Sequence, residues 1–273
     1  MIAEAVAHRT SLTEGDADLA WSATGEGPPL LLIAGLGLDG DSWWRSVPGF
    51  AERFRVITFD YRGVGRSGRA PLSCTTDDLA DDAVAVLDEA GVERALVYGF
   101  SLGGMVAQRL ALRHAGRLSA LVLGATQAGG THAVQPGAST LACLWQARFL
   151  SRAAAAKAAV PHVYGERCRR ETPHRIDADL EQRRQRRLDR RAYRGQVIAA
   201  MMHDAHRSLR AIDAPTMVVH GEDDRLIPKE NGELIAREIP DARLSLIPHA
   251  GHYYSTDEPN VDGVIADFFA DCG

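Results

Sequence analysis

The chain has 273 residues, of which 45% are hydrophobic and 25% charged, and its formal net charge is −5. This composition excludes wholesale disorder, collagen and coiled coil. The negative charge argues against a general nucleic-acid binder, which usually has a basic surface. Four widely spaced cysteines form no C-x-x-C pair, so they indicate reduced thiols rather than a disulfide framework or a zinc site.

The N-terminal residues show no basic segment followed by an apolar one, and no apolar run approaches the ~18 residues of a membrane span. We therefore expect a cytoplasmic protein that binds neither membranes nor nucleic acids. Nothing in these patterns specifies an oligomeric state.

Six short apolar runs rich in β-branched residues recur along the chain, with helical patterns between several of them. Near-continuous apolar strands are typical of a parallel sheet covered on both faces, and the alternation predicts βαβ units. The predicted strands are Leu30–Ala34, Arg55–Asp60, Ala95–Gly99, Leu118–Leu123, Thr216–His220 and Arg243–Pro248. The predicted helices are Asp77–Ala90, with Thr75 or Thr76 as N-cap, Leu102–His114, Asn231–Glu238 and Asn260–Ala270.

The alternation of strands and helices is interrupted between about Thr131 and Leu209, where Ala and Arg dominate. We expect several helices there, inserted between two strands of the sheet. Residues 1–130 and 210–273 are therefore predicted to form an α/β core, and residues 131–209 a helical cap.

Gly99-Phe100-Ser101-Leu102-Gly103 matches G-x-S-x-G between a predicted strand and a predicted helix. A nucleophilic serine on a sharp strand-to-helix turn needs small neighbours, because the backbone doubles back there. The helix N-terminus also favours the negative charge that develops during attack. The motif predicts Ser101 as a nucleophile, and the alternative is a glycine-rich turn that packs helix closely on strand.

A serine nucleophile needs a base and an orienting acid, which in this arrangement follow it in the order acid, then histidine, each beyond a later strand. Asp223 and Asp224 follow the fifth predicted strand, and His249 and His252 follow the sixth. The carboxyl ends of parallel strands meet at one edge of a sheet, so we expect an acid and a histidine to converge on Ser101.

These motifs resemble the α/β-hydrolase superfamily, over nearly all of the chain outside the predicted cap. The family's Gly-x-x-Asp-x-x-x-Pro acid loop falls on Gly221, Asp224 and Pro228, and its C-terminal Gly-His on Gly251 and His252. The resemblance thus selects Asp224 over Asp223 and His252 over His249.

What the resemblance implies is a catalytic triad of Ser101, Asp224 and His252 on an α/β-hydrolase fold. That fold is a mostly parallel, eight-stranded sheet with helices on both faces and a helical cap insertion. The stretch from Asp60 to Ser67 matches Asp-x-Arg-Gly-x-Gly-x-Ser, a structural loop in this family.

The resemblance also implies an oxyanion hole made of two backbone amides, those of Leu102 and Leu36. Many members carry His before Gly35, whereas this chain has Ala34. The donor is a backbone amide, so the departure need not remove the hole. No cofactor and no metal are expected.

The Gly-x-Ser-Leu-Gly-Gly-Met-Val elbow resembles those of 3-oxoadipate enol-lactone hydrolases and aromatic polyketide methylesterases. These relatives imply a small-molecule substrate, an ester or lactone of a small to medium organic acid, cleaved through an acyl-enzyme. The fold and triad leave C–C bond hydrolases, cofactor-free haloperoxidases or perhydrolases, and thioesterases open. A non-catalytic ligand-binding protein of this fold is a further alternative, although such a protein would usually lack a triad member.

Two other patterns suggest chemistry that we do not expect. Gly35 to Gly40 match the dinucleotide-binding pattern G-x-G-x-x-G, with Asp60 beyond them, but Pro48 would interrupt the helix that such a site requires. His203 and His206 are spaced i,i+3, but no third metal ligand accompanies them.

Residues 166–194 contain 11 Arg and 6 acidic residues. The segment either attracts an anionic substrate to the cap or forms the solvated face of the cap helices, and we favour the solvated face. The arginines that we expect on this solvated face are Arg183, Arg184, Arg186 and Arg187.

Several apolar side chains are candidates for a substrate pocket. We expect the cap to present an apolar underside, and two tryptophans could add to the lining. The residues are Val197, Ile198, Met201 and Met202 in the cap, and Trp43 and Trp44 in the core.

Overall fold

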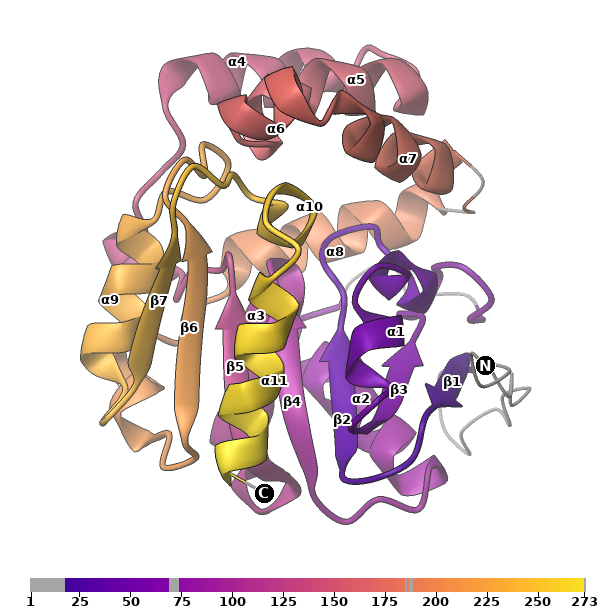
Figure 1. Cartoon of the computed structure of the whole chain (residues 1–273), viewed down its shortest axis with the longest axis vertical. Helices are drawn as coiled ribbons and strands as arrows, with labels where there is room; N and C mark the ends of the chain where they lie inside the picture. The colour runs from indigo at the N-terminus through magenta and orange to yellow at the C-terminus, as the bar shows by residue number, and fades with distance from the viewer. Residues whose placement is uncertain (1–17, 69–73, 185, 187–188, 273) are drawn as a thin grey trace.

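The computed structural model describes residues 18–68, 74–184, 186 and 189–272 (Figure 1). The strands are β1 (Trp21–Thr24), β2 (Pro29–Ile33), β3 (Arg55–Phe59), β4 (Ala95–Phe100), β5 (Leu118–Gly124), β6 (Thr216–Gly221) and β7 (Arg243–Ile247). The α-helices are α1 (Val47–Phe50), α2 (Thr76–Glu89), α3 (Leu102–Arg113), α4 (Ala138–Ala147), α5 (Arg152–Val163), α6 (Glu166–Glu171), α7 (Pro173–Arg184), α8 (Arg190–Met202), α9 (Glu230–Glu238), α10 (Tyr254–Asp257) and α11 (Val261–Cys272). Short 3-10 helices are η1 (Gly40–Trp43), η2 (Ala115–Arg117), η3 (Gly130–His132) and η4 (His206–Ala211).

Seven strands within the described residues form one sheet in the order β1-β3-β2-β4-β5-β6-β7. All neighbouring pairs are parallel except β1 and β3, which are antiparallel. The six predicted apolar runs are β2 to β7, and β1 alternates buried with half-buried residues. Eight strands were expected, and this part of the chain holds seven, because the count of eight rests on the family resemblance and on no apolar run.

Helices cover both faces of the sheet, which is why its central strands are so thoroughly apolar. All six residues of β4 are buried. Helices α1 and α11 contact each other on one face, and α2 and α3 pack together on the other, with α3 directly against β4 and β5 (Figure 1). The predicted layering is confirmed. It brings the carboxyl ends of β4, β6 and β7 to the same edge of the sheet.

The chain between β5 and β6 forms helices α4 to α8. In Figure 1, α4 to α7 lie above the carboxyl ends of the parallel strands, and α8 runs beneath α7. Helices α5 to α7 and the residues joining them contain a small hydrophobic cluster of their own, made of Val163, Tyr164, Cys168 and Ile176. Helix α8 differs from them, because its Ala192 and Ala199 belong to the main core.

None of the helices in the described part of the chain combines the length and the apolar character needed to cross a lipid bilayer.

Candidate active site

Ser101 lies at the turn between β4 and α3, with φ 56° and ψ −116°. This left-handed backbone conformation is uncommon for a non-glycine residue and signals a sharply bent, strained turn. A Cβ on Gly99 would lie 2.2 Å from the carbonyl oxygen of Gly103, and a Cβ on Gly103 would lie 2.0 Å from that of Ile33. Only glycine fits at these two positions, so the sequence motif and the turn require each other.

A chain of hydrogen bonds connects Ser101, His252 and Asp224. The His252 Nε2 atom lies 3.0 Å from Ser101 Oγ, and its Nδ1 atom lies 2.7 Å from Asp224 Oδ2. Asp224 and His252 are 5% and 2% exposed, so water does not compete for these bonds. An ionised carboxylate only accepts hydrogen bonds, so Nδ1 donates to it and Nε2 is left to accept from the serine hydroxyl.

The alternative acid and the alternative histidine, Asp223 and His249, lie outside this hydrogen-bond chain. Asp223 is exposed beside the buried Asp224, and His249 is exposed at a backbone φ of 60°. The structure therefore brings together the acid and the histidine that the resemblance selects.

The carboxylate of Asp224 is held by more than His252. Its Oδ1 atom accepts hydrogen bonds from the backbone N–H groups of Leu226 and Ile227, both at 2.9 Å. Burial by itself raises the pKa of Asp224, but attraction to His252 and hydrogen bonds from His220 and His252 outweigh it and lower the pKa to about 2. Asp224 is consequently an anion at neutral pH.

His220, at the end of β6, is a second histidine beside Asp224 that the sequence analysis did not single out. It is fully buried, and its Nε2 atom lies 2.8 Å from the carbonyl oxygen of Ile227 and 3.4 Å from Asp224 Oδ2. Its i,i+4 spacing from Asp224 was the available signal. This histidine ties the acid loop to the strand that carries it.

The loop after β2 carries Leu36 and lies against the nucleophile, since a Cβ on Gly35 would lie 3.4 Å from the Ser101 Cβ. Leu102, the first residue of α3, follows Ser101 directly. Within the described residues, neither the Leu36 nor the Leu102 amide donates to a protein acceptor. Both predicted oxyanion donors thus lie on segments next to Ser101.

Two side chains hold this loop in place, and the sequence analysis identified neither. The Tyr61 hydroxyl donates to the carbonyl oxygen of Ala34 at 2.9 Å. The Gly37 N–H donates to Gln196 Oε1 at 2.8 Å, across 159 positions of the chain. Gln196 is 1% exposed and comes from α8, so an inserted helix supports the loop that carries Leu36.

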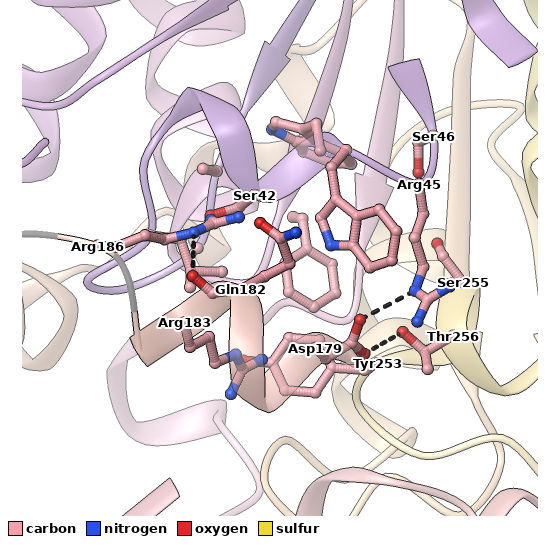
Figure 2. Close-up of a pocket in the computed structure, with 16 residues that line it drawn as sticks. Ser42, Arg45, Ser46, Asp179, Gln182, Arg183, Arg186, Tyr253, Ser255 and Thr256 are labelled. Atoms are coloured by element: carbon pink, nitrogen blue, oxygen red, sulfur yellow. Dashed lines mark hydrogen bonds and ion pairs between the residues drawn. The ribbon is translucent and has the colours of Figure 1, made fainter. Parts of the chain in front are cut away.

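A pocket adjoins this site, between the core and α7 (Figure 2). Its walls combine aromatic and apolar side chains with three arginines. It is lined by Ala34, Gly35, Leu38, Ser42, Trp43, Trp44, Arg45, Ser46, Phe100, Asp179, Gln182, Arg183, Arg186, Tyr253, Ser255 and Thr256. The two tryptophans are therefore pocket residues.

The apolar residues expected on the underside of the cap lie differently. Ile198, Met201 and Met202 are 49%, 80% and 75% exposed, and neither they nor Val197 line this pocket. Helix α8 turns Ala192, Gly195, Gln196 and Ala199 inward instead. The expectation was wrong because an apolar pattern cannot tell which face of α8 meets the core.

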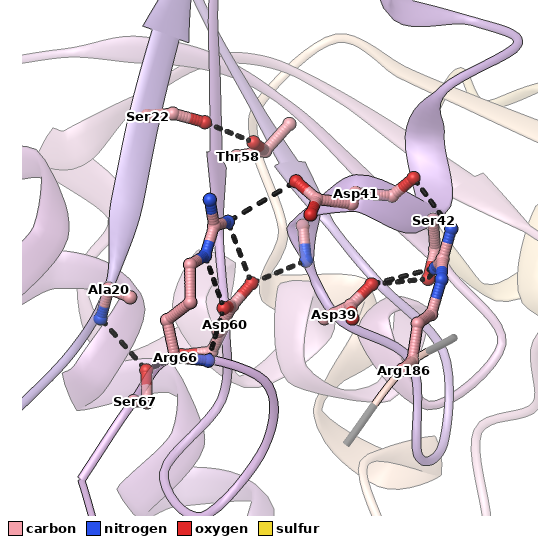
Figure 3. Close-up of polar contacts among 11 residues, drawn as sticks. Ala20, Ser22, Asp39, Asp41, Ser42, Thr58, Asp60, Arg66, Ser67 and Arg186 are labelled. Atoms are coloured by element: carbon pink, nitrogen blue, oxygen red, sulfur yellow. Dashed lines mark hydrogen bonds and ion pairs between the residues drawn. The ribbon is translucent and has the colours of Figure 1, made fainter. Parts of the chain in front are cut away.

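The solvated-face interpretation of the arginine-rich segment was also wrong for two of its residues. Arg183 lies over the Tyr253 ring at 4.2 Å, and the Arg186 side chain is 8% exposed and lies 2.7 Å from Asp39 (Figures 2 and 3). Arg184 is 68% exposed, as expected, and Arg187 lies outside the described residues. Charge composition does not show which way side chains of α7 and of the residues after it point, because packing decides this.

The Gly35 to Gly40 stretch, which matches the dinucleotide-binding pattern, has a structural role. The Gly40 N–H donates to Asp60 Oδ1 at 2.8 Å, and Arg66 donates to Asp60 through its backbone and its side chain (Figure 3). After Gly40 comes only a 3-10 turn and then the four-residue helix α1, with Pro48 in its first turn. No phosphate-binding helix follows the motif.

The two histidines of the i,i+3 pair point to different partners. His203 is buried beside Thr76, and burial lowers its pKa to about 4. His206 stacks on His132 at 3.9 Å. In the part of the chain that the structure describes, no three potential metal ligands gather at one place.

Comparisons with known proteins support the fold and the class of enzyme. The family model described as alpha/beta hydrolase fold matches residues 28–259. The chain is 31% identical to the "Putative carbamate hydrolase RutD" of Azorhizobium caulinodans over 90% of this chain and 92% of that protein. It is 27% identical to a thermophilic esterase from Thermogutta terrifontis, with a TM-score of 0.79 over 96% and 97% of the two chains. For the enol-lactonase from Burkholderia xenovorans LB400 the identity is 25% and the TM-score 0.80, over 93% and 97%.

Proposed function

The chain belongs to the α/β-hydrolase family and is a hydrolase, and on this premise we propose that it cleaves a carboxylic ester or lactone of a small to medium organic acid. Ser101 is the nucleophile, His252 the base and Asp224 the orienting acid. The observation that carries the proposal is the hydrogen-bond chain of 3.0 Å and 2.7 Å that links the three side chains.

The reaction begins when Ser101 Oγ attacks the substrate carbonyl and His252 Nε2 takes the hydroxyl proton. The ionised Asp224 keeps the imidazole in the tautomer that can accept this proton and stabilises the imidazolium that forms. The imidazolium then donates its proton to the departing alkoxide, which leaves Ser101 acylated. Water, deprotonated by the same imidazole, hydrolyses the acyl-enzyme.

The oxyanion of each tetrahedral intermediate accepts hydrogen bonds from the backbone amides of Leu36 and Leu102. Donors that are fixed before the reaction stabilise developing charge without reorganising, and removing one such donor elsewhere costs about 10²–10³ in kcat. Tyr61 and Gln196 hold the Leu36 loop from two sides. The position of Leu102 is set by the turn at Ser101.

The helices between β5 and β6 act as a cap in this proposal. Residues 131–209 form the cap, and residues 1–130 and 210–273 form the catalytic core. The pocket supports this division, because Asp179, Gln182 and Arg183 of α7 line one side of it and the core lines the other.

A second candidate is hydrolysis of a carbamate by the same three residues. The relative from Azorhizobium caulinodans carries that activity in its name, and its likeness extends over 90% of this chain. A carbamate carbonyl accepts the same serine attack, so the site geometry fits both candidates. The esterase and enol-lactonase structures favour the ester or lactone.

Labelling with a fluorophosphonate probe tests whether Ser101 is the nucleophile. A substrate panel tests whether the protein cleaves esters, lactones or carbamates. We expect the wild-type protein to be labelled and Ser101→Ala to lose both the label and roughly 10⁴–10⁶ of its turnover. The exposed Ser208 provides the control variant Ser208→Ala, which should label normally. The panel comprises 4-nitrophenyl esters of increasing acyl length, γ- and δ-lactones, and phenyl carbamate. Labelling of Ser101→Ala at the wild-type level would reject the covalent mechanism.

A further inference from the structure

The pocket beside Ser101 holds more positive than negative charge. Three of the residues that line it are arginines, and one is a carboxylate, Asp179. A fourth arginine, Arg152, does not line the pocket but donates to the backbone carbonyl oxygen of Arg186.

Two of the arginines are paired within the protein. Arg186 lies 2.7 Å from Asp39 and donates to Ser42, as Figure 3 shows. The Arg45 Nε atom lies 2.9 Å from Asp179 (Figure 2). Asp179 also accepts from two hydroxyl groups, so it has little capacity left for another cation.

Arg183 is different, because it lines the pocket without a direct ion pair, although the nearby charge of Asp179 attracts it. Its guanidinium lies over the Tyr253 ring, 4.2 Å from the centroid, and the side chain is partly buried. Among the residues that the structure describes, no carboxylate lies within 4.0 Å of it. Stacking engages the face of the guanidinium and a hydrogen bond with Tyr253 engages part of its edge, so the remaining N–H groups are left to bind a carboxylate.

The distance from Arg183 to the proposed reaction centre is bridged by aromatic rings. Tyr253 follows His252 in the chain, and its ring lies 5.6 Å from that of Phe100, which precedes Ser101. Phe100 itself lies 5.1 Å from the His252 ring. One pocket therefore extends from the residues beside Ser101 to Arg183, with Trp43 and Leu38 in its walls.

We infer that the substrate carries a carboxylate on its acyl part, and that Arg183 binds this carboxylate while Ser101 attacks the ester or lactone carbonyl. The inference rests on the proposed function and narrows it to anionic substrates. The apolar wall between the two ends suits a short methylene or ring spacer. Arg183 is thus a residue that determines specificity, supplied by α7.

The first experiment compares two esters that differ in one charge, 4-nitrophenyl hydrogen adipate and 4-nitrophenyl methyl adipate, in wild type and Arg183→Gln. We expect wild type to prefer the anionic ester, and the ratio of the two kcat/KM values to fall by about tenfold or more in the variant. Arg183→Lys should recover part of the ratio, because it keeps the charge and loses the bidentate geometry. Arg184→Gln, one position along α7 at an exposed residue, is the matched control and should keep the wild-type ratio.

An equal loss on both esters in Arg183→Gln would mean that Arg183 acts only in packing, and a wild type without preference for the anionic ester would also overturn the inference. Thermal unfolding of each variant checks that it folds.

The second experiment separates this inference from the proposed function. Calorimetric titration of Ser101→Ala with monomethyl adipate measures binding without turnover. We expect binding that weakens as NaCl is raised and that weakens at least tenfold when Arg183→Gln is added. If none of the esters is hydrolysed but this binding is found, the proposed function fails and the anionic subsite stands. Absent or salt-independent binding rejects the subsite even if neutral esters are hydrolysed.

Discussion

Asp223 and Asp224 are chain neighbours with the same functional group, but only Asp224 is buried against His252, whereas Asp223 is exposed. Asp224→Asn should lower kcat by about 10⁴, because an amide cannot hold the imidazole in the tautomer that accepts the serine proton. Asp223→Asn should stay within about twofold of wild type, as surface substitutions usually do. Steady-state kinetics on a 4-nitrophenyl ester measures both, and a larger loss for Asp223→Asn would show that the acid is wrongly assigned.

The interaction between Asp224 and His252 also bears on how activity depends on pH. Attraction to His252 and the surrounding hydrogen bonds overcome burial and hold the pKa of Asp224 at about 2, so its carboxylate stays ionised down to about pH 4. Protonation of Asp224 should therefore cause no loss of kcat/KM between about pH 4 and pH 8, and Asp224→Asn should lower kcat/KM by a similar factor throughout this range. A pH profile of both proteins on a neutral ester tests this. A variant that matches wild type at pH 4 but not at pH 8 would contradict an ionised Asp224.

At the scale of elements, α8 and the Leu36 loop are coupled through a buried hydrogen bond from the Gly37 N–H to Gln196. Gln196→Leu keeps the size but removes the acceptor, and an unsatisfied buried N–H costs about 1–3 kcal/mol. The loop that carries Leu36, the proposed oxyanion donor, should then be displaced, so we expect kcat to fall about tenfold with a smaller change in KM. Gln196→Glu, which still accepts from Gly37, should recover part of kcat.

The matched control for this prediction is Ile198→Ala, two positions along α8 at an exposed side chain. Its kcat should equal that of wild type. If Gln196→Leu raises KM and leaves kcat intact, α8 contributes to substrate binding rather than to the oxyanion loop.

At the scale of the whole molecule, Asp262 in α11 accepts a hydrogen bond from Ser255 and makes folding dependent on pH. Burial raises its pKa to about 6, although hydrogen bonds from Ser46 and Ser255 lower it. The folded chain holds this proton between about pH 4 and pH 6 while the unfolded chain has released it, so ionisation of Asp262 reduces stability as the pH rises through this window. The loss reaches at most about 3 kcal/mol above pH 6.

Asp262→Asn removes that penalty and keeps an oxygen that can accept from Ser255. We expect the variant to have a higher free energy of unfolding than wild type at pH 7.5, and the difference to decline toward pH 4. Urea denaturation at both pH values provides the measurement. A difference of the same size at both would mean that packing, and not the charge, is responsible.

Much of the core could be predicted from the sequence, because the pattern of a buried parallel strand is local. Strands β2 to β7 begin and end within one residue of the predicted runs. The short edge strand β1 was missed, since its alternating pattern spans only four residues. Ser101, Asp224 and His252 could be predicted as the candidate triad for a related reason. Each lies in a short motif beyond a strand, and parallel strands bring such ends to one edge of the sheet.

The surroundings of the site were decided by tertiary packing. Gln196 and His220 gave no motif, and their partners Gly37 and Asp224 become neighbours only when α8 and the acid loop are packed on the core. Arg183 and Arg184 are adjacent in the sequence and identical in chemistry, but one faces the pocket and the other water. The sequence alone determined the fold class and the candidate triad, because strand patterns and turn motifs depend on adjacent residues. Only the tertiary structure decided which charges face the pocket beside Ser101, because the rotation of a surface helix depends on what it packs against.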